Sequence, residues 1–340
     1  MRPFSVEIFD RSLNFKQNTE IGKISFNYDY LSPESNTFDL RAVSPAIDDY
    51  VKMSNGEETY FGIVSEYEKK KNGITSMTIK DVMTLFDVDI IVDSASMTGT
   101  LESFIAGLIT SLYISNTDTS MNENITVSAE TSTSAWKLDL EPIDENTTLC
   151  EVNLFDDIIL PAFKAYEIVM TSTMNMTTKK IDFKITKNTA SDVTFEADLP
   201  EIIEKNIAVR RSSQRTNKLI IYNKDNMAAA PTIYFLHTDG THSTTDTDRV
   251  VPVRWDYSYI GENDSAADEA AKVFAEEKYD NLITLSMVDA PKLKVGQHVN
   301  VIADGVVYPT ILTGREDDQV TKLIFGNIRM SLIKQLKGRG

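Results

Sequence analysis

Two segments near opposite ends of the chain, residues 50–81 and 298–326, share one pattern of apolar and polar positions. In each segment an alternating stretch meets an X-Gly dipeptide, either Asn55-Gly56 or Asp304-Gly305. A second apolar stretch then leads through a charged loop into a third. Alternation with period two predicts strands, and an Asn-Gly or Asp-Gly pair between such stretches predicts a hairpin turn. We therefore expect three antiparallel strands in each segment.

Apolar residues of the two segments recur at a constant separation. Four pairs lie 248 positions apart: Val51 and Val299, Met53 and Val301, Ile63 and Ile311, and Val64 and Leu312. The glycines of the two turns lie one position further apart. A duplicated unit would produce this spacing, but any two amphipathic hairpins share such alternation. The residues alone leave both interpretations open.

The first hundred residues are typical of a small β domain. Phe4, Val6 and Ile8 alternate with polar residues, and similar alternation recurs at 24–30 and 38–42. Several short strands separated by regular turns predict a small barrel or sandwich over residues 1–97.

After Thr100 the apolar period becomes that of a helix. Apolar residues recur at helical spacing from Leu101 to Leu112, with Thr100 placed to cap the helix. The tetrapeptide 148–151, Thr-Leu-Cys-Glu, has the form of a capping box and predicts a second helix, which Pro161 should kink or end. We expect residues 98–200 to form an α/β lobe inserted into an otherwise β-rich chain.

The remaining residues return to a β pattern with one further helix. Alternating stretches occur at 207–209, 218–222 and 232–236, and a helix is predicted from Ser265 to Tyr279. We expect residues 201–225 to complete the first β domain, 226–262 to form a small β lobe, and 263–340 to form a second β domain with an outer helix.

Acidic side chains outnumber basic ones. The chain has 51 Asp and Glu residues against 34 Lys and Arg residues, a net charge of −17. Nucleic-acid phosphates and anionic lipids should repel such a surface, which argues against a conventional DNA-binding protein. The apolar runs are too short to span a bilayer, and the first ten residues lack the hydrophobic stretch of a secretory signal. We expect no membrane insertion and folding in a reducing cytoplasm.

No catalytic motif stands out. The single cysteine, Cys150, excludes an intrachain disulfide, and it either has an activated thiol at a helix start or packs inward. His237, Asp239 and His242 could be drawn as a metal site, but their Asp-Gly pair favours a surface turn. His298 is expected to be exposed on a strand. We predict no catalytic residue, no cofactor and no metal.

A basic cluster joins the predicted α/β lobe to the next strand. Arg210, Arg211 and Arg215 lie within six residues of one another in a strongly acidic chain. They could pair with carboxylates of a neighbouring subunit, which makes them candidate subunit-contact residues. They could equally belong to a solvated linker.

The chain resembles tail proteins of siphophages and prophages of Gram-positive bacteria, often labelled prophage tail or tail endopeptidase proteins. The resemblance is carried by NKLIIYNKDNMAAAPTIYFLHTDGT, DRVVPVRWDYSYI, AADEAAKVFAEEKY and LKVGQHVNVIADGVVYPTILTGRE, and near the start by YVKMSNGEETYFGIV and SMTIKDVMTLFD. The resemblance covers essentially the whole chain. The order of these segments is what is specific to the family, because no single motif among them is diagnostic.

The resemblance implies a tail-tip or baseplate hub with a mainly β fold, two tube-like β-barrel domains, an α/β insertion and peripheral lobes. Such a hub is a structural virion protein. Three copies with two similar barrels each would form a pseudo-sixfold ring that joins the tail tube to receptor-binding or fibre proteins, with DNA passing through the lumen unbound. An acidic lumen would repel that DNA, which would give the net charge a role.

Three alternatives to a phage tail hub remain open. The endopeptidase label suggests a cell-wall peptidase, although the chain ends directly after the last hub-like segment and carries no catalytic constellation. The Thr- and Asn-rich α/β lobe could instead hold a host saccharide. A hub of a related contractile injection system has the same expected architecture.

Overall fold

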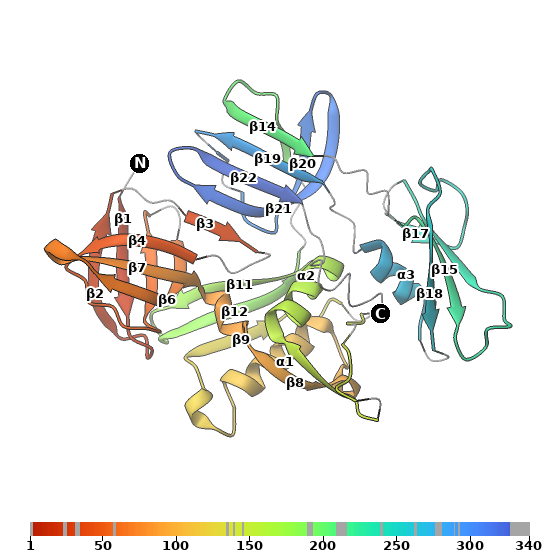
Figure 1. Ribbon diagram of the computed structural model, residues 1–340, viewed down its shortest axis with the longest axis horizontal. Helices are drawn as coiled ribbons and strands as arrows, with labels where there is room; N and C mark the ends of the chain where they lie inside the picture. The colour runs from red at the N-terminus through yellow and green to blue at the C-terminus, as the bar shows by residue number, and fades with distance from the viewer. Residues whose placement is uncertain are drawn as a thin grey trace.

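The structure is a computed structural model in which β-strands predominate (Figure 1). It describes residues 3–22, 26–30, 35–56, 59–133, 136–138, 140–144, 146–188, 193–208, 216–238, 241–261, 264–275, 281–288, 290–291 and 293–326. Two curled half-barrel sheets lie next to each other, an α/β lobe packs below them in the view of Figure 1, and a small sheet with one helix projects at the far side. The predicted mainly β fold with two barrel-like sheets is confirmed.

The first half-barrel is a six-stranded sheet with strand order β2-β1-β5-β6-β7-β4. Its strands are β1 (Phe4–Phe9), β2 (Phe15–Ile21), β4 (Ser35–Arg41), β5 (Tyr50–Ser54), β6 (Thr59–Lys69) and β7 (Ile74–Asp81). Alternate residues are buried, as in β4, where Asn36, Phe38 and Leu40 face inward and their neighbours are exposed. The apolar residues of that inner face form one core, so the period-two pattern of the sequence determines which face is buried.

The second half-barrel has the order β13-β20-β21-β22-β19-β14, with β3 paired to β21. Its strands are β3 (Phe26–Asp29), β13 (Val193–Glu196), β14 (Ile202–Ala208), β19 (Leu282–Met287), β20 (His298–Ala303), β21 (Val306–Asp317) and β22 (Thr321–Gly326). It encloses a separate core that includes Leu285, Val301, Leu323 and Phe325.

Four consecutive strands of each half-barrel repeat the same unit. The order β4-β7-β6-β5 matches β19-β22-β21-β20, and every pair within both units is antiparallel. Tyr50 pairs with Ile63, and His298 pairs with Ile311, so the two hairpins have the same register at an offset of 248. The offset of apolar residues in the sequence therefore reflects a shared register.

The irregularities of the two units coincide as well. A β-bulge interrupts β6 between Val64 and Glu66, and another interrupts β21 between Leu312 and Gly314, again 248 positions later. The backbone of Val64 bonds to residues 48 and 49, and that of Leu312 bonds to residues 296 and 297. A bulge is a specific local feature rather than a consequence of alternation, so the two units form an internal structural repeat.

Strand β3 belongs to both half-barrels. Its backbone pairs with residues 314–317 of β21, while the Phe26 side chain is buried in the core of the first sheet. The Phe26 ring lies 5.1 to 5.4 Å from the rings of Phe4, Phe38 and Tyr60. Just beyond β3, the Tyr30 hydroxyl accepts a hydrogen bond from Met170 N–H (2.8 Å) in the α/β lobe. Strand β3 and the residue that follows it thus contact the first half-barrel, the second half-barrel and the α/β lobe.

The α/β lobe lies between the strands of the two half-barrels in sequence. It contains β8 (Asp89–Asp93), β9 (Ile125–Ala129), β10 (Leu149–Asn153), β11 (Ile168–Asn175), β12 (Lys180–Lys187), α1 (Leu101–Tyr113) and α2 (Leu160–Tyr166), with a π-helix at Leu154–Ile159 and short 3-10 helices at Val82–Phe86, Ser94–Ser96 and Thr119–Met121. A further 3-10 turn, Lys71–Gly73, connects β6 to β7 in the first half-barrel. Its core is continuous with one face of the first sheet, through residues such as Phe9, Tyr50 and Ile63. The lobe is therefore packed against the half-barrel.

The helix expected to start at Thr148 does not begin there, because residues 149–153 form strand β10. Residues of β10 pair with β8, and alternate side chains, Cys150 and Val152, are buried. The helical turn begins only after Asn153, whose side chain accepts hydrogen bonds from the N–H groups of Phe155 and Asp156. The Thr-x-x-Glu pattern is a local signal, and pairing with β8 overrides it.

The last unit is a four-stranded sheet with the order β17-β16-β15-β18, covered on one face by a helix. Its elements are β15 (Lys218–Asn223), β16 (Thr232–Leu236), β17 (His242–Ser243), β18 (Trp255–Ile260) and α3 (Ala266–Ala275). Ser265 caps α3 as expected, since its hydroxyl accepts from Asp268 N–H (3.2 Å). None of the described helices is long and apolar enough to cross a membrane.

Residues 201–225 were expected to complete the first β domain, and the pairing shows otherwise. Strand β14 pairs with β19 of the second half-barrel, and β15 pairs with β16 and β18 of the small sheet. Long-range packing determines which strands pair with each other, and the alternation within one strand does not show its partner. Helix α3, expected as the outer helix of the second β domain, packs on the small sheet instead, and β13, expected in the α/β lobe, pairs with β20 of the second half-barrel. The boundary at 97 remains a prediction.

Removing the Phe26 ring should destabilise the protein because the ring is buried at the point where the two half-barrels share β3. We predict that Phe26→Ala lowers the free energy of unfolding by about 3–5 kcal/mol, the range for truncating a buried Phe. Urea unfolding followed by circular dichroism measures this.

The matched control is Phe15→Ala, because Phe15 is 56% exposed. It should cost less than about 1 kcal/mol. Equal losses for the two variants would contradict a special role for Phe26.

Candidate functional site

Cys150 is a core residue and not a nucleophile at a helix start. It is fully buried on β10, paired with Val92, and its thiol lies 3.7 Å from the carbonyl oxygen of Thr148. The activated-thiol interpretation depended on a helix that does not form. The alternative, that Cys150 packs inward, describes the structure.

His237 and His242 do not converge on a metal site. The His237 Nδ1–H donates to the Thr247 carbonyl oxygen (2.8 Å), and in the neutral ring Nε2 accepts from the Ser243 hydroxyl (2.8 Å). His242 lies on the opposite face of the sheet, between Tyr234 and Phe274, and burial lowers its pKa. Asp239, the third residue of that motif, lies outside the described residues. Within the described part of the chain no cluster of three His, Cys, Asp or Glu could hold a metal ion.

The expectation that His298 is exposed was wrong. Its Nε2 lies 2.8 Å from Glu167 Oε2, and the side chains of His298 and Glu167 are only 19% and 14% exposed. Glu167 ends α2, so this contact joins the α/β lobe to the second half-barrel. Alternation on a strand indicates which face a residue occupies but not what covers that face.

The candidate subunit-contact residues Arg210, Arg211 and Arg215 lie outside the described residues. Their proposed pairing with a neighbouring subunit therefore stays a prediction.

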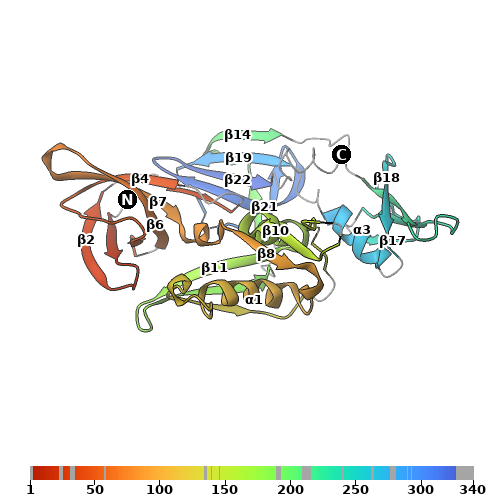
Figure 2. The ribbon, with the colours of Figure 1, turned by 60° about the horizontal axis from the view of Figure 1, so that its bottom comes forward.

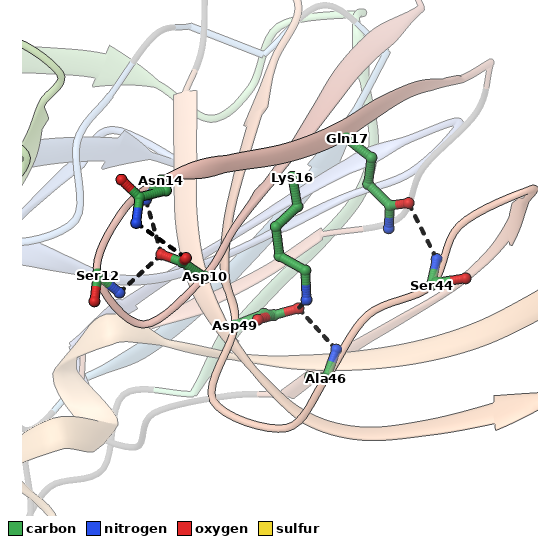
Figure 3. Close-up of polar contacts among 8 residues, drawn as sticks. All are labelled: Asp10, Ser12, Asn14, Lys16, Gln17, Ser44, Ala46 and Asp49. Carbon is green, nitrogen blue, oxygen red and sulfur yellow. Dashed lines mark hydrogen bonds and ion pairs between the residues drawn. The ribbon is translucent and has the colours of Figure 1, made fainter.

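Side-chain hydrogen bonds close the open side of the first half-barrel (Figure 3). Lys16 of β2 lies 2.6 Å from Asp49, whose carboxylate also accepts from Ala46 N–H (2.7 Å). Next to it, Gln17 accepts from Ser44 N–H (3.2 Å). These contacts join edge strand β2 to the loop between β4 and β5. They hold the sheet in its curl without a backbone ladder between its two ends.

The turn between β1 and β2 is fixed by one carboxylate (Figure 3). Asp10 accepts hydrogen bonds from the N–H groups of Ser12 (2.9 Å) and Asn14 (2.8 Å). These hydrogen bonds lower the pKa of Asp10, so it stays ionised through the neutral range.

An aromatic stripe covers the outward face of the small sheet. Trp255, Tyr257 and Tyr259 of β18 are 62%, 50% and 58% exposed, and the ring of Tyr222 stacks on that of Tyr259 at 6.0 Å. The opposite face packs on α3. Exposed aromatic side chains of this kind are typical of surfaces that contact other molecules. Sequence alternation could have located the stripe, but the covered face had to be known to show that it is exposed.

Asp81 is a half-buried acid whose position the sequence did not predict. Asp81 ends β7 and caps the following 3-10 helix by accepting from Met83 N–H (2.9 Å). Burial raises its pKa to about 6. No pattern in the sequence distinguishes it from the many solvated acids of this chain.

Comparisons with known proteins identify the fold. No protein-family model matches the chain, and no curated protein matches its sequence. The prophage tail protein gp18 from Listeria monocytogenes EGD-e superposes with a TM-score of 0.54 at 13% identity, covering 98% of this chain and 97% of that one. The tail protein from Neisseria meningitidis MC58 gives a TM-score of 0.52 at 13% identity, covering 95% and 96%.

The chain has a phage tail-protein fold. Both superpositions extend over nearly all of each chain, so the likeness includes the half-barrels, the lobe and the small sheet together. At this low identity it concerns the fold alone.

Asp81 gives a pH-dependent test of the junction between the first sheet and the lobe. Its folded pKa of about 6 lies above the ordinary value of 3.8, so folding favours the protonated form. The stabilisation is complete below pH about 4 and is lost as pH rises through about 6. Asp81→Asn keeps an oxygen to accept from Met83 N–H and removes the charge. We predict that the variant matches the wild type near pH 4 and is more stable by roughly 1–3 kcal/mol at pH 8.

Urea unfolding of both proteins between pH 4 and pH 8 measures the difference. A difference that does not change with pH would show that the Asp81 carboxylate is solvated in the folded protein.

Proposed function

We propose that this chain is a structural subunit of a phage tail tip or baseplate, a hub that joins the tail tube to distal tip components. The observation that carries this proposal is the fold shared with two tail proteins over almost the full length of all three chains. The internal repeat adds to it, because a protein that meets a symmetric tube benefits from two similar units in one chain.

We further propose that three copies form a pseudo-sixfold ring. The two half-barrels of each copy share a four-stranded unit with the same strand order, register and bulge, so three copies present six such units. Such a ring can dock on a sixfold tube on one side and offer threefold symmetry on the other. The tail tube would lie on one side and receptor-binding or fibre proteins on the other, and DNA would pass through the lumen without specific binding.

The expected acidic lining of that lumen stays a prediction. The outward face of the first half-barrel carries Glu7, Glu20, Asp39, Glu66 and Glu68 together with Arg41, Lys52 and Lys80. Glu7 is already paired with Lys52 at 3.1 Å. If this face lines the channel, its carboxylates would repel DNA phosphates and its cations would lie among them, so DNA would pass without specific binding.

The alternative enzymatic function has no observation in its favour. A peptidase would draw on Cys150, His237 or His242, and these are engaged in the core, in hydrogen bonds or between aromatic rings. The saccharide-binding alternative likewise stays a hypothesis. So do a Gram-positive host and assembly in the host cytoplasm before incorporation into the virion tail tip.

Immunogold electron microscopy tests the proposed location. Antibodies raised against the purified chain should label one end of the tail in phage-like particles from cells that encode it. The matched control is the same serum absorbed with the purified chain. Particles with no label on their tails, or with label on the capsid, would contradict the proposed function.

A further inference from the structure

The repeat makes two strand segments equivalent. Residues 66–69 of β6 and 314–317 of β21 follow their bulges at the same offset of 248. Each segment pairs on one edge with the third strand of its hairpin unit, β7 or β22. Their opposite edges therefore occupy corresponding places in the two half-barrels.

In the second half-barrel that opposite edge is filled. Strand β3 pairs antiparallel with residues 314–317. Tyr30 N–H also donates to the Thr313 carbonyl oxygen (3.1 Å). Because backbone groups of alternate residues point to the same edge of an antiparallel strand, Arg315 and Asp317 also face β3.

In the first half-barrel the corresponding edge has no strand beside it among the described residues. The equivalents of Arg315 and Asp317 are Tyr67 and Lys69, so their N–H and C=O groups point to this free edge. Residues 65–73 are all exposed, and the end of the β6–β7 hairpin projects from the body of the molecule (Figure 2). A row of backbone groups with no partner strand is a ready site for strand addition.

The charge of this projecting hairpin restricts its partner. Lys69, Lys70 and Lys71 form its tip, beyond Glu66 and Glu68 of the edge segment. Of these three lysines only Lys70 has an ion pair among the contacts that the structure shows, with Asp39 at 2.8 Å. The rest of the chain is strongly acidic, at a net charge of −17 for the whole. A basic tip is therefore complementary to the surface of another copy of the same chain.

We propose that the free edge of β6, at residues 66–69, pairs with an extended strand of a second copy of this chain, as β3 pairs with β21 within one copy. The proposal rests on the ring of the proposed function and specifies one of its contacts. In this proposal, the pairing of β3 with β21 within one chain is the model for the contact between two chains. A contact between two different surfaces of identical chains is heterologous, and such contacts form a ring where the rotation between neighbouring chains closes.

Proline substitution tests the pairing. In Tyr67→Pro the free edge loses one N–H, while the ladder to β7, which uses the alternate residues, keeps its donors. The matched control is Tyr67→Ala, which removes the side chain and keeps the N–H. Sedimentation velocity from about 1 to 200 µM measures self-association of each variant. We expect the association constant to fall about tenfold or more for Tyr67→Pro and to stay within about threefold for Tyr67→Ala.

Hydrogen exchange supplies a second readout on the wild-type chain. The amides of Tyr67 and Lys69 should exchange more slowly at high protein concentration than at low concentration, whereas exposed loop amides should not change. A wild-type chain that stays monomeric throughout this range would overturn the proposal. So would equal association of both variants, or loss of association in Tyr67→Ala alone.

These results are independent of the tail-labelling experiment. Labelled tails together with unaffected self-association in Tyr67→Pro would reject the strand pairing and leave the proposed function standing. The reverse combination, lost association without label on any tail, would support the pairing and reject the tail location.

Discussion

Strand β3 is the structural element on which the arrangement of this protein depends. Its backbone completes an edge of the second half-barrel, and its Phe26 side chain fills the core of the first. Separating the two half-barrels would break a backbone ladder and expose a buried aromatic ring at the same time. The lost backbone hydrogen bonds and the exposed aromatic ring would both cost free energy, and both involve the same four residues. The relative position of the half-barrels is consequently fixed by the chain itself, before any partner binds.

Because the unit is duplicated, the fixed position of the two half-barrels in one chain is also a model for how neighbouring chains would be arranged. Two half-barrels with the same register and bulge, held by β3, form one pair of neighbours in a larger ring. The contact inside a chain thereby describes what a neighbouring chain has to provide at the equivalent edge of β6. The differences between the units are informative too. Gly314 lies in close contact with Tyr28 of β3, where an added Cβ would come within 3.3 Å of the Tyr28 carbonyl oxygen, whereas Glu66 occupies the equivalent position on the free edge.

Much of the local structure follows from the sequence. The alternation of Phe4, Val6 and Ile8, the hairpin turns, and helix α1 with its Thr100 cap are all where the apolar periods place them. These features depend on neighbours within a few residues. The same reasoning failed at residues 148–151, where a capping pattern was present but pairing with β8 was stronger.

Long-range choices could not be derived in this way. Alternation in β3 predicts a strand but not that its backbone and its side chains serve different sheets. The partner of β14, the Glu167 beside His298 and the raised pKa of Asp81 all depend on segments far away in sequence. The 248-residue offset was the exception. It was visible in the sequence, and the bulges show that it records register rather than general alternation.

Cryo-electron microscopy of the tail tip in assembled particles measures most directly whether three chains build the ring. We predict six half-barrels around one channel, alternating between the two units of each chain, with threefold symmetry overall. A tip with one half-barrel per chain at the channel, or with two or six copies of the chain, would contradict this arrangement.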